Sequence, residues 1–218
     1  MKNNAIDIGC MDFRFQSFSK NKKLSFAGGA KELLLNNDLL EYIKTKKGNK
    51  IISVHEDCGI YKTIYGEKFS DNILENDLRI CKEKLGHGKY IIRKVDGSEY
   101  DITTRKTNKI VAMNPTEIVN KHTAKGIIIS ETWLQRNFTT NNQYDYVSLD
   151  NDILDVIIDK KNFLNTLIFD NIKIAETLHN IDNIVIYTSD TNNEKYIVCK
   201  EIMNKEFNKL DIKIHRIK

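Results

Sequence analysis

Two short segments of the chain carry side chains that can bind a metal ion. The first has the pattern Cys10-x-Asp12-x-Arg14, and the second has the pattern His55-x-x-Cys58. Zinc prefers thiolate sulfur and imidazole nitrogen, and a catalytic zinc site typically has three protein ligands and one open position. The spacing of two residues lets one turn present both His55 and Cys58 to the same ion, and Cys10 can supply the third ligand. The residue types therefore indicate a metal site, with Asp12 and Arg14 beside it.

Each segment has a plainer interpretation when it is taken alone. A single His-x-x-Cys pattern is a weak signal, because Cys10 can be a core thiol and His55 a loop histidine. In the same way, Asp12 and Arg14 can form an ordinary, partly buried ion pair at the end of a strand. The metal hypothesis is favoured because the two patterns occur together, each directly after a predicted strand.

Apolar runs before the two segments predict the strands that position them. Residues 5–8 and 51–54 are expected to be strands, and Cys10 and His55 follow them closely. Further strands are predicted at 24–26, 90–95 and 110–113, and helices at 31–44 and 69–85. This alternation predicts an α/β fold with a mainly parallel sheet flanked by helices. Functional groups in such sheets gather beyond the carboxyl ends of the strands, so Cys10 and His55 should share one edge.

The second half of the chain continues the α/β pattern without a second metal-binding motif. We divide the chain into residues 1–114, the metal domain, and residues 115–218, an α/β extension or second lobe of unknown role. Strands are predicted at 126–129, 183–187 and 210–217, and helices at 163–178 and 194–207. The order of strand and following polar cluster is compatible with a degenerate internal repeat, although short apolar strands recur in every α/β protein. No cysteine or histidine stands at the equivalent positions, so no second metal site is expected. A binding surface and a core or dimer contact are equally consistent with Trp133, Gln135, Arg136 and Tyr144.

The composition excludes several classes of protein. The chain has 218 residues, of which 40% are hydrophobic and 29% are charged, as in a globular protein with a sizeable core. The net charge of +4 is spread along the chain, so we expect no nucleic-acid partner. No run approaches the about 20 apolar residues of a membrane span, and no secretion signal is visible. We therefore expect a cytoplasmic protein whose cysteines form no disulfides, with Cys81 and Cys199 in the core.

Together with Ala27-Gly28-Gly29, the two segments resemble the signature of the β-class carbonic anhydrases. That signature is Cys-x-Asp-x-Arg, then a small-residue segment, then His-x-x-Cys-Gly, and the resemblance covers about residues 4–95. It implies that Zn²⁺ is bound by Cys10, His55 and Cys58. It also implies that Asp12 and Arg14 form a catalytic dyad that orients a zinc-bound hydroxide. The substrate would lie near the small residues Gly28, Gly29 and Gly59.

The resemblance implies that the protein hydrates carbon dioxide, a small-molecule substrate, to bicarbonate. It also implies a homodimer or higher homo-oligomer. Asp12 would either pair with Arg14, which leaves the metal open, or swing onto the metal and close it. The usual Arg-Asn before the small residues is replaced by Ser25-Phe26, and no N-terminal helical arm precedes the first strand.

Two alternatives remain open at this point. One is a related zinc hydrolase that acts on carbon disulfide or carbonyl sulfide through the same ligands. The other is a non-enzymatic zinc-binding protein that keeps a carbonic-anhydrase-like core. The presence of Asp12 and Arg14 argues against the second alternative, because a purely structural zinc site does not need them.

Overall fold

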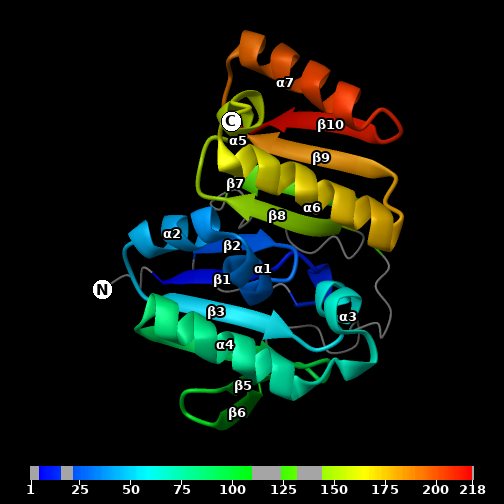
Figure 1. The fold of residues 1–218 in the computed structure, drawn as a ribbon. Helices are drawn as coiled ribbons and strands as arrows, with labels where there is room; N and C mark the ends of the chain where they lie inside the picture. Colours follow the sequence, from blue (N-terminus) through cyan, green and yellow to red (C-terminus); the bar gives the residue numbers. More distant parts are fainter. Residues whose placement is uncertain (1–4, 16–21, 110–123, 132–143, 218) are drawn as a thin grey trace. The chain divides into compact units, whose positions relative to one another are not determined.

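The computed structural model describes residues 5–15, 22–109, 124–131 and 144–217, and the chain divides into two compact units. The first unit is Met1–Lys121 and the second is His122–Lys218. In each unit, helices cover parallel strands (Figure 1). The strand expected at 110–113 and the residues Trp133, Gln135 and Arg136 lie outside the described residues.

The sheet of the first unit is mainly parallel, as predicted. Its strand order is β2-β1-β3-β4-β5-β6, in which β1 to β4 are parallel and β5 and β6 are antiparallel additions. The strands are β1 (Ile6–Cys10), β2 (Lys22–Phe26), β3 (Lys50–His55), β4 (Gly88–Arg93), β5 (Ser98–Asp101) and β6 (Lys106–Lys109). The helices are α1 (Ala30–Leu35), α2 (Asn37–Thr45), α3 (Gly59–Tyr65) and α4 (Asp71–Leu85), with 3₁₀ turns η1 (Phe13–Phe15) and η2 (Gly66–Lys68).

The order of the strands brings the two predicted metal-binding segments to one edge of the sheet. Strand β1 lies between β2 and β3. The connection after β1 leads to β2 on one side, whereas the connection after β3 leads to β4 on the other side. In open α/β sheets, ligands bind at such a switch point beyond the carboxyl ends of the strands. Cys10 is the last residue of β1 and His55 is the last residue of β3. From the sequence, both residues are instead expected just after the strands end.

An apolar row across the sheet forms the core of the first unit. The strand register places Leu24, Ile8, Ile52 and Tyr90 side by side, and each is at most 1% exposed. Because the four residues share one row, they lie on one face, and helices α1 and α4 pack against β3 there. Burial of each such side chain stabilises the fold by about 1.5–3 kcal/mol.

The single helix expected at 31–44 is two helices in the structure. Asn36 interrupts it with an extended backbone (φ −114°, ψ 101°), and its side-chain oxygen accepts a hydrogen bond from the Leu39 N–H at 3.0 Å. Asparagine competes with the helical hydrogen bonds in this way and is a preferred N-cap. Helix α4, in contrast, begins after Ser70 and ends at Gly86 (φ 75°), as the sequence predicts.

The second unit has the strand order β10-β9-β7-β8, and all of its strands are parallel. The strands are β7 (Gly126–Glu131), β8 (Tyr144–Leu149), β9 (Asn183–Thr188) and β10 (Asp211–Arg216). The helices are α5 (Ile153–Ile158), α6 (Phe163–His179) and α7 (Asn193–Glu206). Strand β8, which begins at Tyr144, and helix α5 were not expected from the sequence.

The two units share a strand order. In chain order, β1 to β4 and β7 to β10 both form the arrangement second-first-third-fourth. The residues that correspond to Cys10 and His55 at the ends of the strands are Glu131 and Thr188. The repetition of topology therefore comes without repetition of the metal-binding side chains.

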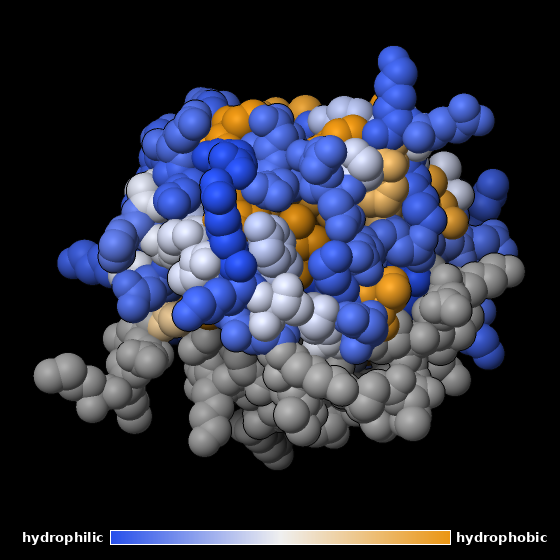
Figure 2. All heavy atoms as spheres, turned by 90° about the horizontal axis from the view of Figure 1, so that it is seen from below, coloured by the Kyte–Doolittle hydropathy of each residue, from blue (hydrophilic) through white to orange (hydrophobic). Residues whose placement is uncertain are grey.

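Figure 2 shows one face of the molecule. In the coloured part of this view, hydrophilic residues predominate and surround several hydrophobic ones. None of the helices in the described ranges is long and apolar enough to cross a membrane.

Candidate metal centre

Three potential ligands from separate parts of the first unit meet at one point. Atoms of Cys10, His55 and Cys58 that can bind a metal lie within 4.8 Å of one another. These residues are 9%, 2% and 1% exposed, respectively. Across residues 5–15, 22–109, 124–131 and 144–217, this is the one cluster of at least three such side chains with metal-binding spacing. The arrangement can therefore hold a metal ion, in the place that the sequence predicts.

The turn between the second and third ligands is made at Asp57. Its φ of 62° lies in the left-handed region, which aspartate and asparagine adopt more readily than most residues. Cys58 then caps helix α3 at its N-terminus, and Gly59 is the first helical residue. The tight turn therefore comes one residue before Cys58.

The imidazole of His55 presents one nitrogen to the cluster. Its Nδ1 lies 2.6 Å from the carbonyl oxygen of Glu56, so Nδ1–H donates and Nε2 is the nitrogen available to the cluster. Nε2 is buried and has no hydrogen-bond partner among the described residues. A buried polar atom without a partner is costly, and a metal ion would satisfy it. The ring also stacks on Phe15 with centroids 4.0 Å apart, which fixes its orientation.

The two thiols interact closely. Hydrogen bonds from Cys10 and from the backbone N–H groups of Ile60 and Tyr61 lower the pKa of Cys58, against the effect of burial. The hydrogen bond to Cys58 and burial raise the pKa of Cys10. Cys58 is therefore the thiol of the pair that loses its proton more readily. A divalent cation would release the second proton, because metal binding requires deprotonated thiols.

Asp12 and Arg14 form a buried ion pair beside the ligands. Arg14 Nε donates to Asp12 Oδ1 at 3.0 Å, and Nη2 donates to Oδ2 at 2.7 Å. Asp12 Oδ2 lies 4.0 Å from His55 Nε2. Of the two arrangements considered for Asp12, the structure has the one in which it pairs with Arg14.

Arg14 has a second carboxylate partner that the sequence does not reveal. Its Nη1 donates to Asp57 Oδ2 at 2.8 Å. Burial disfavours the charged form of Arg14, but hydrogen bonds to Asp12 and Asp57 raise its pKa above the usual value. Burial likewise opposes ionisation of Asp57, and Lys62 and Arg14 lower its pKa. Arg14 therefore joins η1 to the turn between the two ligands.

The small residues pack directly behind the ligands. A Cβ atom on Gly29 (φ 55°) would lie 2.5 Å from the Ser53 carbonyl oxygen and 3.1 Å from the Cys10 nitrogen. A Cβ atom on Gly28 (φ 73°) would lie 3.1 Å from Ile60 Cγ2. Gly29 can approach this buried backbone because it has no side chain, and the positive φ of both residues favours glycine. A role of Gly28, Gly29 and Gly59 in substrate binding stays a prediction.

A buried arginine, also missed from the sequence, supports the site from the end of β4. Arg93 Nη1 donates to the Phe15 carbonyl oxygen at 3.1 Å, and Phe15 stacks on His55. The same guanidinium donates to Asp7 at 2.9 Å and to Glu99 at 3.2 Å. The available signal for this contact is a charged residue at the end of an apolar strand, together with the acidic Asp7 in the otherwise apolar β1.

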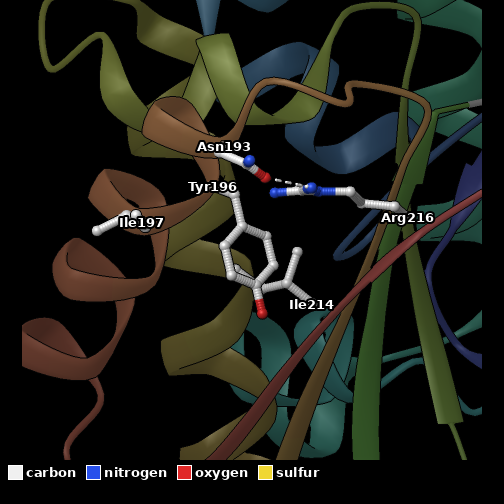
Figure 3. Close-up of a pocket in the computed structure, with 5 residues that line it drawn as sticks. All are labelled: Asn193, Tyr196, Ile197, Ile214 and Arg216. Carbon is white, nitrogen blue, oxygen red and sulfur yellow. Dashed lines mark hydrogen bonds between the residues drawn. The ribbon is translucent and has the colours of Figure 1, made fainter.

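The described part of the second unit holds no such cluster. Glu131 accepts a hydrogen bond from the Ser189 hydroxyl at 3.1 Å, at the position that Cys10 occupies in the first unit. A pocket of this unit is lined by residues of α7 and β10 (Figure 3). Within it, the Arg216 side chain donates a hydrogen bond to Asn193 at 2.7 Å, and its guanidinium carbon lies 4.6 Å from the centre of the Tyr196 ring.

The remaining cysteines and histidines stand outside the site. Cys81 and Cys199 are fully buried free thiols, as predicted. Histidines 87 and 215 are exposed and His179 is half-buried, whereas His122 lies outside the described residues. No family model matches this chain, and no curated protein or solved structure matches it either.

Proposed function

We propose that this protein is a zinc enzyme that hydrates carbon dioxide to bicarbonate. The observation that carries the proposal is the position of the Asp12–Arg14 pair. It lies beside the buried Cys10, His55 and Cys58, with Asp12 Oδ2 4.0 Å from His55 Nε2. A metal site with three ligands and an adjacent ionised carboxylate has the parts that hydrolytic zinc chemistry needs.

The donor set fits zinc. Two thiolates and one imidazole are soft to intermediate ligands, which favour zinc over magnesium or calcium. The buried Nε2 of His55 has no hydrogen-bond partner among the described residues, and the neighbours of the Cys58 thiol lower its pKa, so both are suited to bind a metal. When zinc is bound, it makes hydroxide available from water near neutral pH.

Asp12 and Arg14 would orient the reacting oxygen. Arg14 donates to both Asp12 oxygens. Asp12 Oδ2, which lies 4.0 Å from His55 Nε2, is the oxygen that would accept a hydrogen bond from a water or hydroxide at the site. This hydrogen bond aims the oxygen lone pair at the carbon of the substrate. Arg14 keeps Asp12 ionised and turned towards itself. Burial strengthens these interactions by excluding water.

Hydration of carbon dioxide, measured by stopped flow with a pH indicator, tests the proposal. We expect activity from the zinc-loaded chain. Asp12→Asn should lower this activity by about 10²-fold with unchanged zinc content, a loss typical of a side chain that acts in general acid–base catalysis. Arg79→Met, which changes an exposed arginine on α4, is the matched control and should keep full activity.

The same preparation separates the alternatives. No hydration of carbon dioxide, with turnover of carbon disulfide or carbonyl sulfide, would replace the proposal by the related zinc hydrolase. Bound zinc without turnover of any of the three substrates would favour a non-enzymatic zinc protein.

A further inference from the structure

We propose that Asp57 is a positioning residue that holds Arg14 against Asp12 and so keeps Asp12 off the metal. The consequence for catalysis rests on the proposed function, but the effect on the metal site can be measured without activity.

The guanidinium of Arg14 is held on two sides. Nε and Nη2 bind Asp12, at 3.0 and 2.7 Å, and Nη1 binds Asp57 at 2.8 Å. Because the guanidinium is planar, contacts at three of its nitrogens fix its rotation as well as its position. The side chain of Arg14 is only 2% exposed, so water cannot replace a lost partner easily. Asp57 is therefore the second anchor of the arginine.

The backbone of Asp57 aims its carboxylate at Arg14. The residue lies between two candidate ligands and has a φ of 62°. Its other carboxylate oxygen is bound by Lys62 of α3, whose side chain is 53% exposed. Charges alternate along Asp12, Arg14, Asp57 and Lys62, from the buried site to the surface. Removal of the Asp57 carboxylate would leave Arg14 with Asp12 as its one anionic partner among the described residues.

Asp12 is the carboxylate placed to compete for the metal. Its Oδ2 lies 4.0 Å from His55 Nε2, a distance that a side-chain rotation can span. Three hydrogen bonds from the Arg14 side chain, and one from the Arg14 backbone N–H, hold it in the present orientation. If Arg14 is free to rotate, these bonds weaken and Asp12 can become a fourth ligand. The open position of the metal would then be closed.

Cobalt(II) in place of zinc gives a direct readout of the open position. An added anion such as azide that binds there changes the visible spectrum, and a titration gives its affinity. We expect Asp57→Gly to weaken azide binding at least about tenfold with unchanged cobalt content. Glycine accepts the positive φ, so this variant removes the carboxylate without straining the turn.

Two further variants control for charge and for folding. Asp57→Asn keeps the turn and an acceptor for Arg14, so it should weaken azide binding less than Asp57→Gly. Lys62→Met leaves the contact between Arg14 and Asp57 in place and should bind azide as the unmodified chain does.

The decisive test is Asp57→Gly in a chain that already carries Asp12→Ala. There the competing ligand is gone, so Asp57→Gly should no longer change azide affinity. Unchanged azide affinity in the single variant Asp57→Gly, loss of cobalt from it, or an equal effect in both backgrounds would overturn the proposal. Absence of carbon dioxide hydration alongside the expected azide pattern would refute the proposed function and leave the role of Asp57 standing.

Discussion

Replacement of Gly29 by alanine should displace a metal ligand, and Gly66 offers a matched control. Both glycines have a φ of 55°, with ψ of −115° and −130°. A Cβ atom on Gly29 would meet the Ser53 carbonyl oxygen at 2.5 Å and the Cys10 nitrogen at 3.1 Å, whereas one on Gly66 meets nothing within 4 Å. The two substitutions therefore share the backbone strain and differ in the collision.

The expected magnitudes follow from these contacts. Backbone in this region costs about 1–3 kcal/mol for a residue other than glycine, so Gly66→Ala should lower the free energy of unfolding by that amount. Gly29→Ala should lower the free energy of unfolding by about 1–3 kcal/mol more than Gly66→Ala, because the new Cβ atom meets buried backbone that cannot move cheaply. The Cys10 backbone must shift to relieve the contact, so the metal affinity should fall as well.

Denaturant unfolding and metal analysis of both variants measure these effects. We expect Gly66→Ala to keep the metal content of the unmodified chain and Gly29→Ala to lose most of it. Equal destabilisation by the two substitutions, with equal metal content, would refute the idea that Gly29 packs against the ligand strand.

Three further outcomes are expected. Arg93→Met should lower the free energy of unfolding by about 3–5 kcal/mol in denaturant titrations, because it removes the buried cation that pairs with both Asp7 and Glu99; an effect near zero would contradict this. Burial lowers the pKa of Lys23 from 10.5 to about 7, so the unfolded chain binds more protons between these values and stability should rise with pH across them. Lys23→Met should remove that rise, and an unchanged pH profile would count against it. Removal of bound metal by a chelator should lower the midpoint of thermal unfolding, because a ligand of the folded state stabilises it; an unchanged midpoint would argue against a metal in the folded chain.

The sequence predicts the parts of the fold that depend on local patterns. Apolar runs before Cys10 and His55 identify β1 and β3, and Ser70 and Gly86 mark the ends of α4. Because parallel strands end at one edge, the meeting of Cys10 with His55 follows from the order of the elements alone.

Other features depend on contacts that no local pattern contains. The helix breaks at Asn36 because its side chain caps the second helix, although the spacing of the apolar residues favours one continuous helix. Short elements such as α3 and β8 are determined by their packing neighbours. The bond from Arg14 to Asp57 joins residues 43 positions apart. The sequence thus predicts which residues meet at the site, and the structure is needed to show what holds them in orientation.

Zinc content per chain is the most direct test of the central claim, that Cys10, His55 and Cys58 form a zinc site. Elemental analysis of the full chain should find one zinc. Cys58→Ser should lose it, because a neutral hydroxyl is a far poorer ligand than a thiolate. Cys199→Ser, which changes an equally buried thiol in the second unit, should keep it. A chain without zinc, or full zinc occupancy in Cys58→Ser, would contradict the account.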